Sequence, residues 1–147
     1  MNKENTEKLF TEFPLLYAGK DKSIQENLMP FGFECDDGWM DIIYNLSVEL
    51  EPLIQKWIDE NGAVEYYPMA MQVKEKFGGL RFYMTFETNE MRDLIYKAED
   101  GSYRACETCG TKENVFSTKG WIRITCQECE DKRMENRKKY LVNKKEQ

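Results

Sequence analysis

Four cysteines near the carboxyl end of the chain have the spacing of a metal site. They form two C-x2-C pairs with sixteen residues between the pairs: Cys106, Cys109, Cys126 and Cys129. Each pair lets one tight turn present two sulfurs to the same ion, and this pattern is typical of zinc sites. Four thiolates suit tetrahedral Zn²⁺ and leave no open position for a substrate, so we expect a structural zinc ion.

Two alternatives to zinc binding remain open for these cysteines. Iron is the next metal that thiolates favour. Disulfides are the second alternative, but the first residues, MNKENTEKLF, lack the apolar segment of a secretory signal. A reducing cytosol then disfavours disulfides. The fifth cysteine, Cys35, stands alone, and a lone cysteine is most often a small buried hydrophobic residue.

The composition excludes the mechanisms that need histidine. The chain has 147 residues and no His. A Ser-His-Asp triad, a Cys-His nucleophile and an HExxH metal site all require imidazole. The sequence also carries no recognisable nucleotide-binding loop. We therefore expect a binding protein more than an enzyme.

Charge divides the chain into an acidic body and a basic end. Residues 1–100 carry 10 Lys and Arg against 20 Asp and Glu, whereas residues 101–147 carry 11 against 7. Such asymmetry marks a contact with nucleic acid or with an acidic protein, or simply a solvated helix face. The residues at this end that we expect to contact a partner are Lys132, Arg133 and Arg137.

The elements that position these groups form an α+β body over residues 1–101. Apolar residues recur every three or four positions from Trp39 to Ile58, which predicts a long helix that Pro52 kinks or splits. Asp36 or Asp37 is the expected cap of this helix. Shorter helices are predicted near Thr6–Phe13 and over the stretch that follows Phe86. The second of them should have Thr88 or Asn89 as its cap and end at Gly101.

Two alternating runs around Gly78-Gly79 predict a β-hairpin packed by the helices. Its apolar face should carry Met71, Val73, Leu80, Phe82, Met84 and Phe86. Its polar face could bind carboxylates or phosphates through Lys and Arg, although a solvated sheet face looks the same. The polar residues that we expect to contact a partner are Gln72, Lys74, Lys76, Arg81 and Tyr83.

Residues 102–143 should form the zinc module, and residues 144–147 a disordered tail. Cys106 to Cys109 resembles a zinc knuckle, and the stretch 114–125 can form a short hairpin that turns at Lys119-Gly120. The second strand of this hairpin should carry Trp121, Ile122 and Ile124. Good helix formers fill the stretch from Gln127 to Leu141, so the second cysteine pair should open a helix. This order favours a treble-clef-like finger over a zinc ribbon.

The acidic residues Glu34, Asp36, Asp37 and Asp41 suggest one catalytic alternative. Neighbouring carboxylates can hold Mg²⁺, and with Lys74 on a strand the set faintly suggests a divalent-metal nuclease. The spacing fits such an enzyme poorly, and helix capping explains the cluster more simply.

The stretches 31–39 (FGFECDDGW) and 72–83 (QVKEKFGGLRFY), together with the paired C-x2-C, are similar to a family of small, largely uncharacterised bacteriophage and prophage proteins. The resemblance covers roughly residues 10–130. It implies an accessory protein that binds and inhibits or redirects a component of the host.

The sequence therefore predicts a non-catalytic, zinc-stabilised binding protein of the host cytoplasm. A protein is the expected partner. A nucleic-acid-binding regulator that uses the basic terminal helix is one alternative, and the nuclease is the other. No apolar run is long enough for a membrane span, so we expect no membrane partner.

Overall fold

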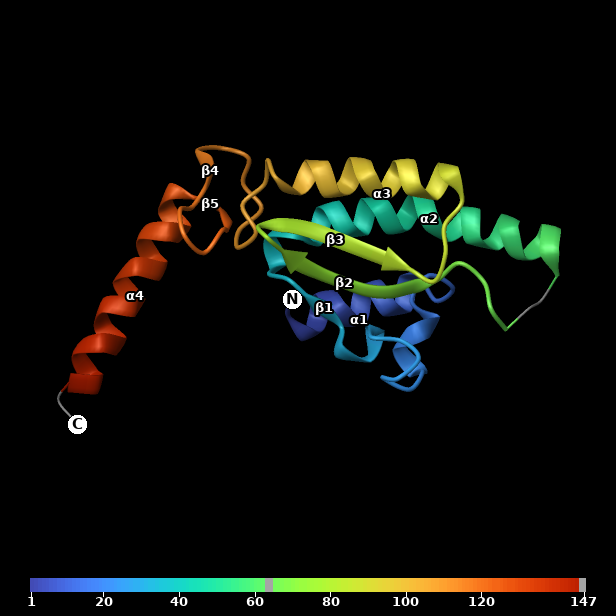
Figure 1. The fold of residues 1–147 in the computed structure, drawn as a ribbon, viewed down its shortest axis with the longest axis horizontal. Helices are drawn as coiled ribbons and strands as arrows, with labels where there is room; N and C mark the ends of the chain where they lie inside the picture. The colour runs from blue at the N-terminus through green and yellow to red at the C-terminus, as the bar shows by residue number, and fades with distance from the viewer. Residues whose placement is uncertain (63–64, 146–147) are drawn as a thin grey trace.

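The computed structural model of the chain describes residues 1–62 and 65–145. Within them it has an α+β fold with four α-helices and two small sheets. The helices are α1 (Lys3–Glu12), α2 (Met40–Asn61), α3 (Asn89–Ser102) and α4 (Gln127–Lys145). Figure 1 shows the body as one mass, with α4 projecting from its far end.

The sheet of the body is built around the predicted hairpin. Strands β2 (Ala70–Lys76) and β3 (Gly79–Met84) pair antiparallel, and the short β1 (Phe33–Glu34) pairs parallel with β2. The turn places Phe77 and Gly78 at φ values of 54° and 83°. Two positive φ values in a two-residue loop suit the right-handed twist of the flanking strands.

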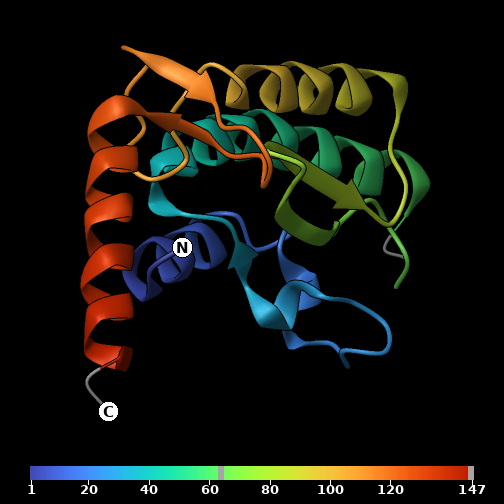
Figure 2. The ribbon, with the colours of Figure 1, turned by 60° about the vertical axis from the view of Figure 1, so that its left-hand side comes forward.

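One hydrophobic core joins the hairpin to the helices. Val73, Leu80 and Phe82 lie in the same cluster as the buried stripe of α2. Helices α2 and α3 run side by side over the sheet (Figures 1 and 2). Tyr17 is fully buried, and its hydroxyl shares a 2.6 Å hydrogen bond with Ser47 of α2.

Part of the predicted hairpin pattern is wrong. The register of β2 shifts between Ala70 and Gln72, so the strand carries a bulge at Met71. The extra residue of a bulge breaks the alternation, so residues on its two sides do not follow one continuous pattern. Ala70 consequently lies in the core, while Met71 is only half-buried and lies beside polar residues.

The helix ends also differ in part from expectation. Thr88 caps α3 by accepting the N–H of Met91, as predicted, but α3 continues through Gly101 to Ser102. Helix α2 continues through Pro52 without splitting. A 3₁₀ turn, η3 (Asp37–Trp39), precedes α2, and neither that turn nor α2 has a side-chain cap. The capping role predicted for Asp36 or Asp37 is therefore wrong.

The module follows α3 directly. Strands β4 (Val115–Ser117) and β5 (Ile124–Cys126) form an antiparallel hairpin, and α4 begins at the next residue. This is the treble-clef-like order of knuckle, hairpin and helix. Helix α4 reaches Lys145, two residues into the stretch 144–147 expected to be a tail, and residues 146–147 lie outside the described part of the chain.

Candidate metal centre

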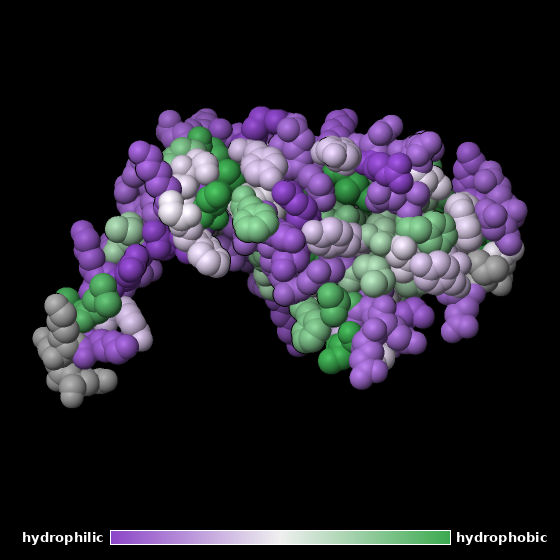
Figure 3. Space-filling view, viewed as in Figure 1, coloured by the Kyte–Doolittle hydropathy of each residue, from purple (hydrophilic) through white to green (hydrophobic). Residues whose placement is uncertain are grey.

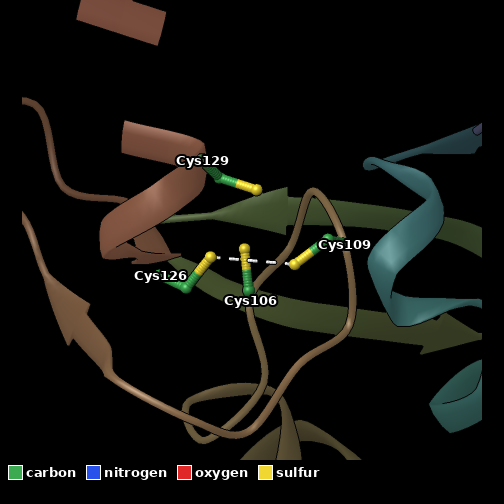
Figure 4. A group of neighbouring side chains, drawn as sticks. All are labelled: Cys106, Cys109, Cys126 and Cys129. Carbon is green, nitrogen blue, oxygen red and sulfur yellow. Dashed lines mark hydrogen bonds between the residues drawn. The ribbon is translucent and has the colours of Figure 1, made fainter. Parts of the chain in front are cut away.

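The four cysteines of the two C-x2-C pairs come together in one cluster. Their sulfur atoms all lie within 4.8 Å of one another. Figure 4 shows the four side chains pointing toward a common centre, two from the knuckle and two from the end of β5 and the start of α4. Cys106 and Cys126 are buried, Cys129 is half-buried and Cys109 is exposed. The cluster is positioned to bind one metal ion.

Backbone geometry builds the knuckle. The N–H of Gly110 donates to the carbonyl of Cys106 at 2.8 Å, which closes the turn between the first two sulfurs. Gly110 adopts a φ of 79°, a conformation that favours glycine. The residue after the cysteine pair therefore lets the chain turn back while both sulfurs stay on the same side.

The surroundings favour a thiolate at Cys106. Burial raises the pKa of this thiol, but backbone N–H groups of Cys109, Cys126 and Thr108 directed at the sulfur lower it more, to about 6. Burial and the neighbouring sulfurs act together to raise the pKa of Cys129. A metal cation replaces these protons when it binds, because thiolates are the metal-binding form.

The module is joined to the body by buried contacts. The indole N–H of Trp39, which is fully buried, donates to the carbonyl of Ala105 at 3.1 Å. The N–H of Gly38 donates to the carbonyl of Glu107 at 2.8 Å. The N–H of Asp36 donates to the carboxylate of Glu107 at 3.2 Å. Two segments far apart in the sequence thereby hold the knuckle against the start of α2.

Glu107 lies inside the knuckle and has an unusual environment. Burial, together with the nearby carboxylates of Asp36 and Glu75, raises the pKa of its carboxyl to about 7. The Asp36 N–H and Arg123 act in the opposite direction and lower this pKa. A group of carboxylates therefore lies beside the cysteine cluster.

Cys35 is buried in the body core, away from the metal cluster. It belongs to the hydrophobic cluster with Phe33 and Trp39. Burial raises the pKa of its thiol to about 12, which keeps it protonated at neutral pH. This agrees with the prediction of a small buried hydrophobic residue.

The polar hairpin residues line two hollows that share Tyr83. Gln72, Lys74, Lys76 and Tyr83 line a shallow hollow of about 360 Å³ together with Met71 and Leu28. Arg81 is the cross-strand neighbour of Lys74 and lines a second hollow with Tyr83. Its guanidinium also donates to the Tyr103 hydroxyl at 3.0 Å.

The predicted residues of α4 are divided between two environments. Lys132 and Arg133 line a separate pocket beside the cysteine cluster. Lys132 is paired with Glu128 at 2.6 Å, and Arg133 contacts both carboxylate oxygens of Glu130 at 2.8 and 2.5 Å. Arg137 is exposed further along the helix.

The acidic residues proposed as a nuclease site form no metal-binding group among the described residues. Glu34 accepts from the Gln72 amide at 2.9 Å. Asp37 accepts from the backbone N–H of Asn2 at 2.8 Å and from the Asn5 amide at 3.0 Å. Among the described residues, the four cysteines are the one group of cysteines and carboxylates that could hold a metal. The geometry gives the nuclease alternative no metal-binding cluster.

Sequence reasoning missed the residues that surround the cluster. Trp121 was expected on a strand but lies in the β4–β5 loop, 74% exposed. Glu75 and Glu107 were not singled out, and Asp36 was considered only as a helix cap or as a ligand of Mg²⁺. A tryptophan beside Gly120 at a predicted hairpin turn, and a glutamate between two ligand cysteines, are the signals that could have found them.

No protein-family model, curated protein or solved structure matches the chain. These comparisons identify no family for the chain, and of the motifs on which the expected resemblance depends, the four-cysteine cluster is seen in three dimensions. Among residues 1–62 and 65–145, no helix has the length and apolar character needed to cross a bilayer.

Proposed function

We propose that the cysteine cluster binds zinc and that this ion is structural. A tetrahedral site with Zn–S bonds of about 2.3 Å has sulfur–sulfur edges of about 3.8 Å. The sulfurs of Cys109 and Cys126 are already 3.7 Å apart. Because all four coordination positions are filled by the protein, the ion has no place for a substrate. Its role is to hold the knuckle, the β4–β5 hairpin and α4 together.

The protein itself is a non-catalytic binding protein, in our proposal an accessory protein of phage type that binds and inhibits or redirects a host protein. One observation carries this proposal: two hairpin tips meet and expose apolar side chains there. A Cβ built on Gly78 would lie 2.7 Å from Ile122 Cγ2, so the β2–β3 turn touches the β4–β5 loop. Phe77 is 72% exposed, Trp121 74% and Ile122 44%.

Such a surface fits a protein partner. Figure 3 shows hydrophobic residues gathered over the β4–β5 hairpin, with polar residues around them. Exposed apolar patches with a polar rim mark interaction sites, and tryptophan is enriched among the residues that dominate binding. The zinc module would keep its half of the surface fixed against the body.

A nucleic-acid partner is the weaker alternative. Three of the basic residues of α4 are ion-paired within the helix, because Lys132, Arg133 and Lys139 contact Glu128, Glu130 and Glu135. The chain carries a formal net charge of −6. Phosphate contacts need exposed, uncompensated cations.

Affinity capture from bacterial lysate, with and without nuclease, tests the proposal. The parent should retain one stoichiometric protein in both arms, identified by mass spectrometry. Phe77→Ala combined with Trp121→Ala should abolish capture. The matched control is Tyr96→Ala, which removes a 70% exposed aromatic from α3 and should leave capture intact.

Two results would contradict the proposal. Capture that disappears with nuclease would support the nucleic-acid alternative. No capture in either arm would revive the enzyme alternative and justify a screen for metal-dependent activity.

A further inference from the structure

A pocket of about 420 Å³ lies where the module joins the body. Its walls come from four places in the chain: Asp36 before η3, Glu75 of β2, Glu107 of the knuckle and Trp121 of the β4–β5 loop. Cys129 and the first turns of α4 complete it. Figure 2 turns this end of the molecule, with α4 and the β4–β5 hairpin, toward the reader. The pocket adjoins the exposed tip that carries Trp121.

The carboxylates of this pocket are not paired by salt bridges. Among the described residues, none of Asp36, Glu75 and Glu107 takes part in an ion pair. One oxygen of Glu75 accepts the N–H of Gly78 at 2.6 Å, and one oxygen of Glu107 accepts the N–H of Asp36. These backbone bonds fix the orientation of the two side chains and leave each with a second carboxylate oxygen.

The basic side of the pocket is largely neutralised. Lys132 and Arg133 are paired with acidic residues of α4 that are not part of the lining. Arg123 is the remaining cation, against the carboxylates of Asp36 and Glu75 and the carboxyl group of Glu107. With zinc bound, the cysteine cluster would add negative charge, because four thiolates around a divalent ion carry a formal charge of −2. The pocket therefore favours a cationic ligand.

Trp121 determines which cation fits best. Its indole lines the pocket while remaining largely exposed, so a ring face is available to a ligand. A guanidinium stacks on an indole face and also bonds carboxylates through two parallel N–H groups. An ammonium is a compact charge without this planar geometry. Aromatic and carboxylate groups in one pocket thus favour arginine over lysine.

We propose that the junction pocket takes an arginine side chain presented by the partner protein, with its guanidinium stacked on Trp121 and bonded by Glu75 and Glu107. This inference rests on the proposed function, since it names the chemistry of the segment that the partner would supply. The apolar residues at the hairpin tips would then pack around the same segment.

The test is a titration of the full chain, loaded with zinc, followed by ¹⁵N NMR of the tryptophan indole N–H groups. The probe is N-acetyl-arginine methylamide, and the matched probe is its citrulline analogue, which has nearly the same shape without the charge. The Trp121 signal, assigned with Trp121→Phe, should shift saturably with the arginine probe. The citrulline probe should bind at least about tenfold more weakly than the arginine probe, as expected for loss of a charge-assisted bond.

Two glutamate variants test whether the arginine probe binds in this pocket. Glu75→Gln should weaken binding of the arginine probe about tenfold, because one bidentate partner is lost. The matched control is Glu49→Gln, which changes an exposed glutamate of α2 and should leave binding unchanged. Equal binding of both probes, or no saturable shift of Trp121, would overturn the inference. A saturable shift with inorganic phosphate instead would assign the pocket to anions through Arg123.

The result separates this inference from the proposed function. If the arginine probe binds but capture from lysate yields no partner, the arginine-binding pocket is supported and the proposed binding function is contradicted. If the parent and Glu75→Gln capture a partner equally and the arginine probe fails to bind, the proposed binding function is supported and the arginine-binding pocket is contradicted.

Discussion

Gly38 and Glu107 are bonded backbone to backbone, and this contact fixes the knuckle of the metal cluster against the start of α2. The N–H of Gly38 donates to the Glu107 carbonyl at 2.8 Å. The approach is so close that a Cβ on Gly38 would overlap the carbonyl oxygens of both Cys106 and Glu107. Glycine is therefore required at position 38 for close approach, since its φ is not in the left-handed region.

Gly38→Ala should lower the free energy of unfolding by about 1–3 kcal/mol, the range for an overpacked site. Backbone atoms on the other side cannot move away as a flexible side chain could. Thermal melting followed by circular dichroism measures the effect. Gly101→Ala is the matched control, because nothing lies within 4 Å of its added Cβ and it lies inside α3. The control should be neutral or slightly stabilising, and equal melting temperatures for both variants would contradict this account.

Removal of the metal should unfold at least the module. Cys126→Ser deletes one of four thiolates, and structural zinc contributes directly to folding. Elemental analysis of the purified parent should give one zinc per chain, and the variant should lose most of it and melt at a lower temperature. Cys35→Ala is the control, because Cys35 lies in the body core outside the cluster. A Cys126→Ser protein that still holds one zinc would refute the ligand assignment.

The fold was largely predictable where local patterns decide it, and the junction was not. The alternation around Gly78-Gly79 predicted the hairpin, and the cysteine spacing predicted the cluster. The bulge at Met71 has no local signature, so the predicted face was wrong at that residue. The bond between Gly38 and Glu107, and the pocket that gathers Asp36 and Glu75 beside it, depend on how the module docks onto the body. The periodicity of apolar residues along the sequence does not show how the module packs against the body.

Thr88→Ala should destabilise the protein by about 1 kcal/mol, the usual effect of losing an N-cap. The Thr88 hydroxyl accepts the N–H of Met91, which otherwise has no partner in the first turn of α3. Urea unfolding should show a lower midpoint with an unchanged slope. Thr88→Ser retains the acceptor oxygen and should restore most of the loss. If serine and alanine behave alike, the cap is not the source of the effect.

Asp37 should make the free energy of unfolding depend on pH in the acid range. Hydrogen bonds from the Asn2 backbone and the Asn5 side chain lower the pKa of its carboxyl below the ordinary value of 3.8. Because the pKa is lower in the folded state, the unfolded state binds the proton first as pH falls. The contribution of Asp37 is therefore complete above the ordinary pKa and is lost as pH falls through the folded-state pKa.

The comparison of the parent with Asp37→Asn isolates this contribution. One oxygen of Asp37 accepts both bonds, and an asparagine oxygen can still accept them without titrating. The difference in free energy of unfolding between parent and variant, measured by urea at a series of pH values, should shrink from about pH 5 downward. Other acid-sensitive groups, the cysteine cluster included, are common to both proteins and cancel in the difference. A difference that stays constant over this pH range would show that the bonds from Asn2 and Asn5 do not favour the charged carboxylate.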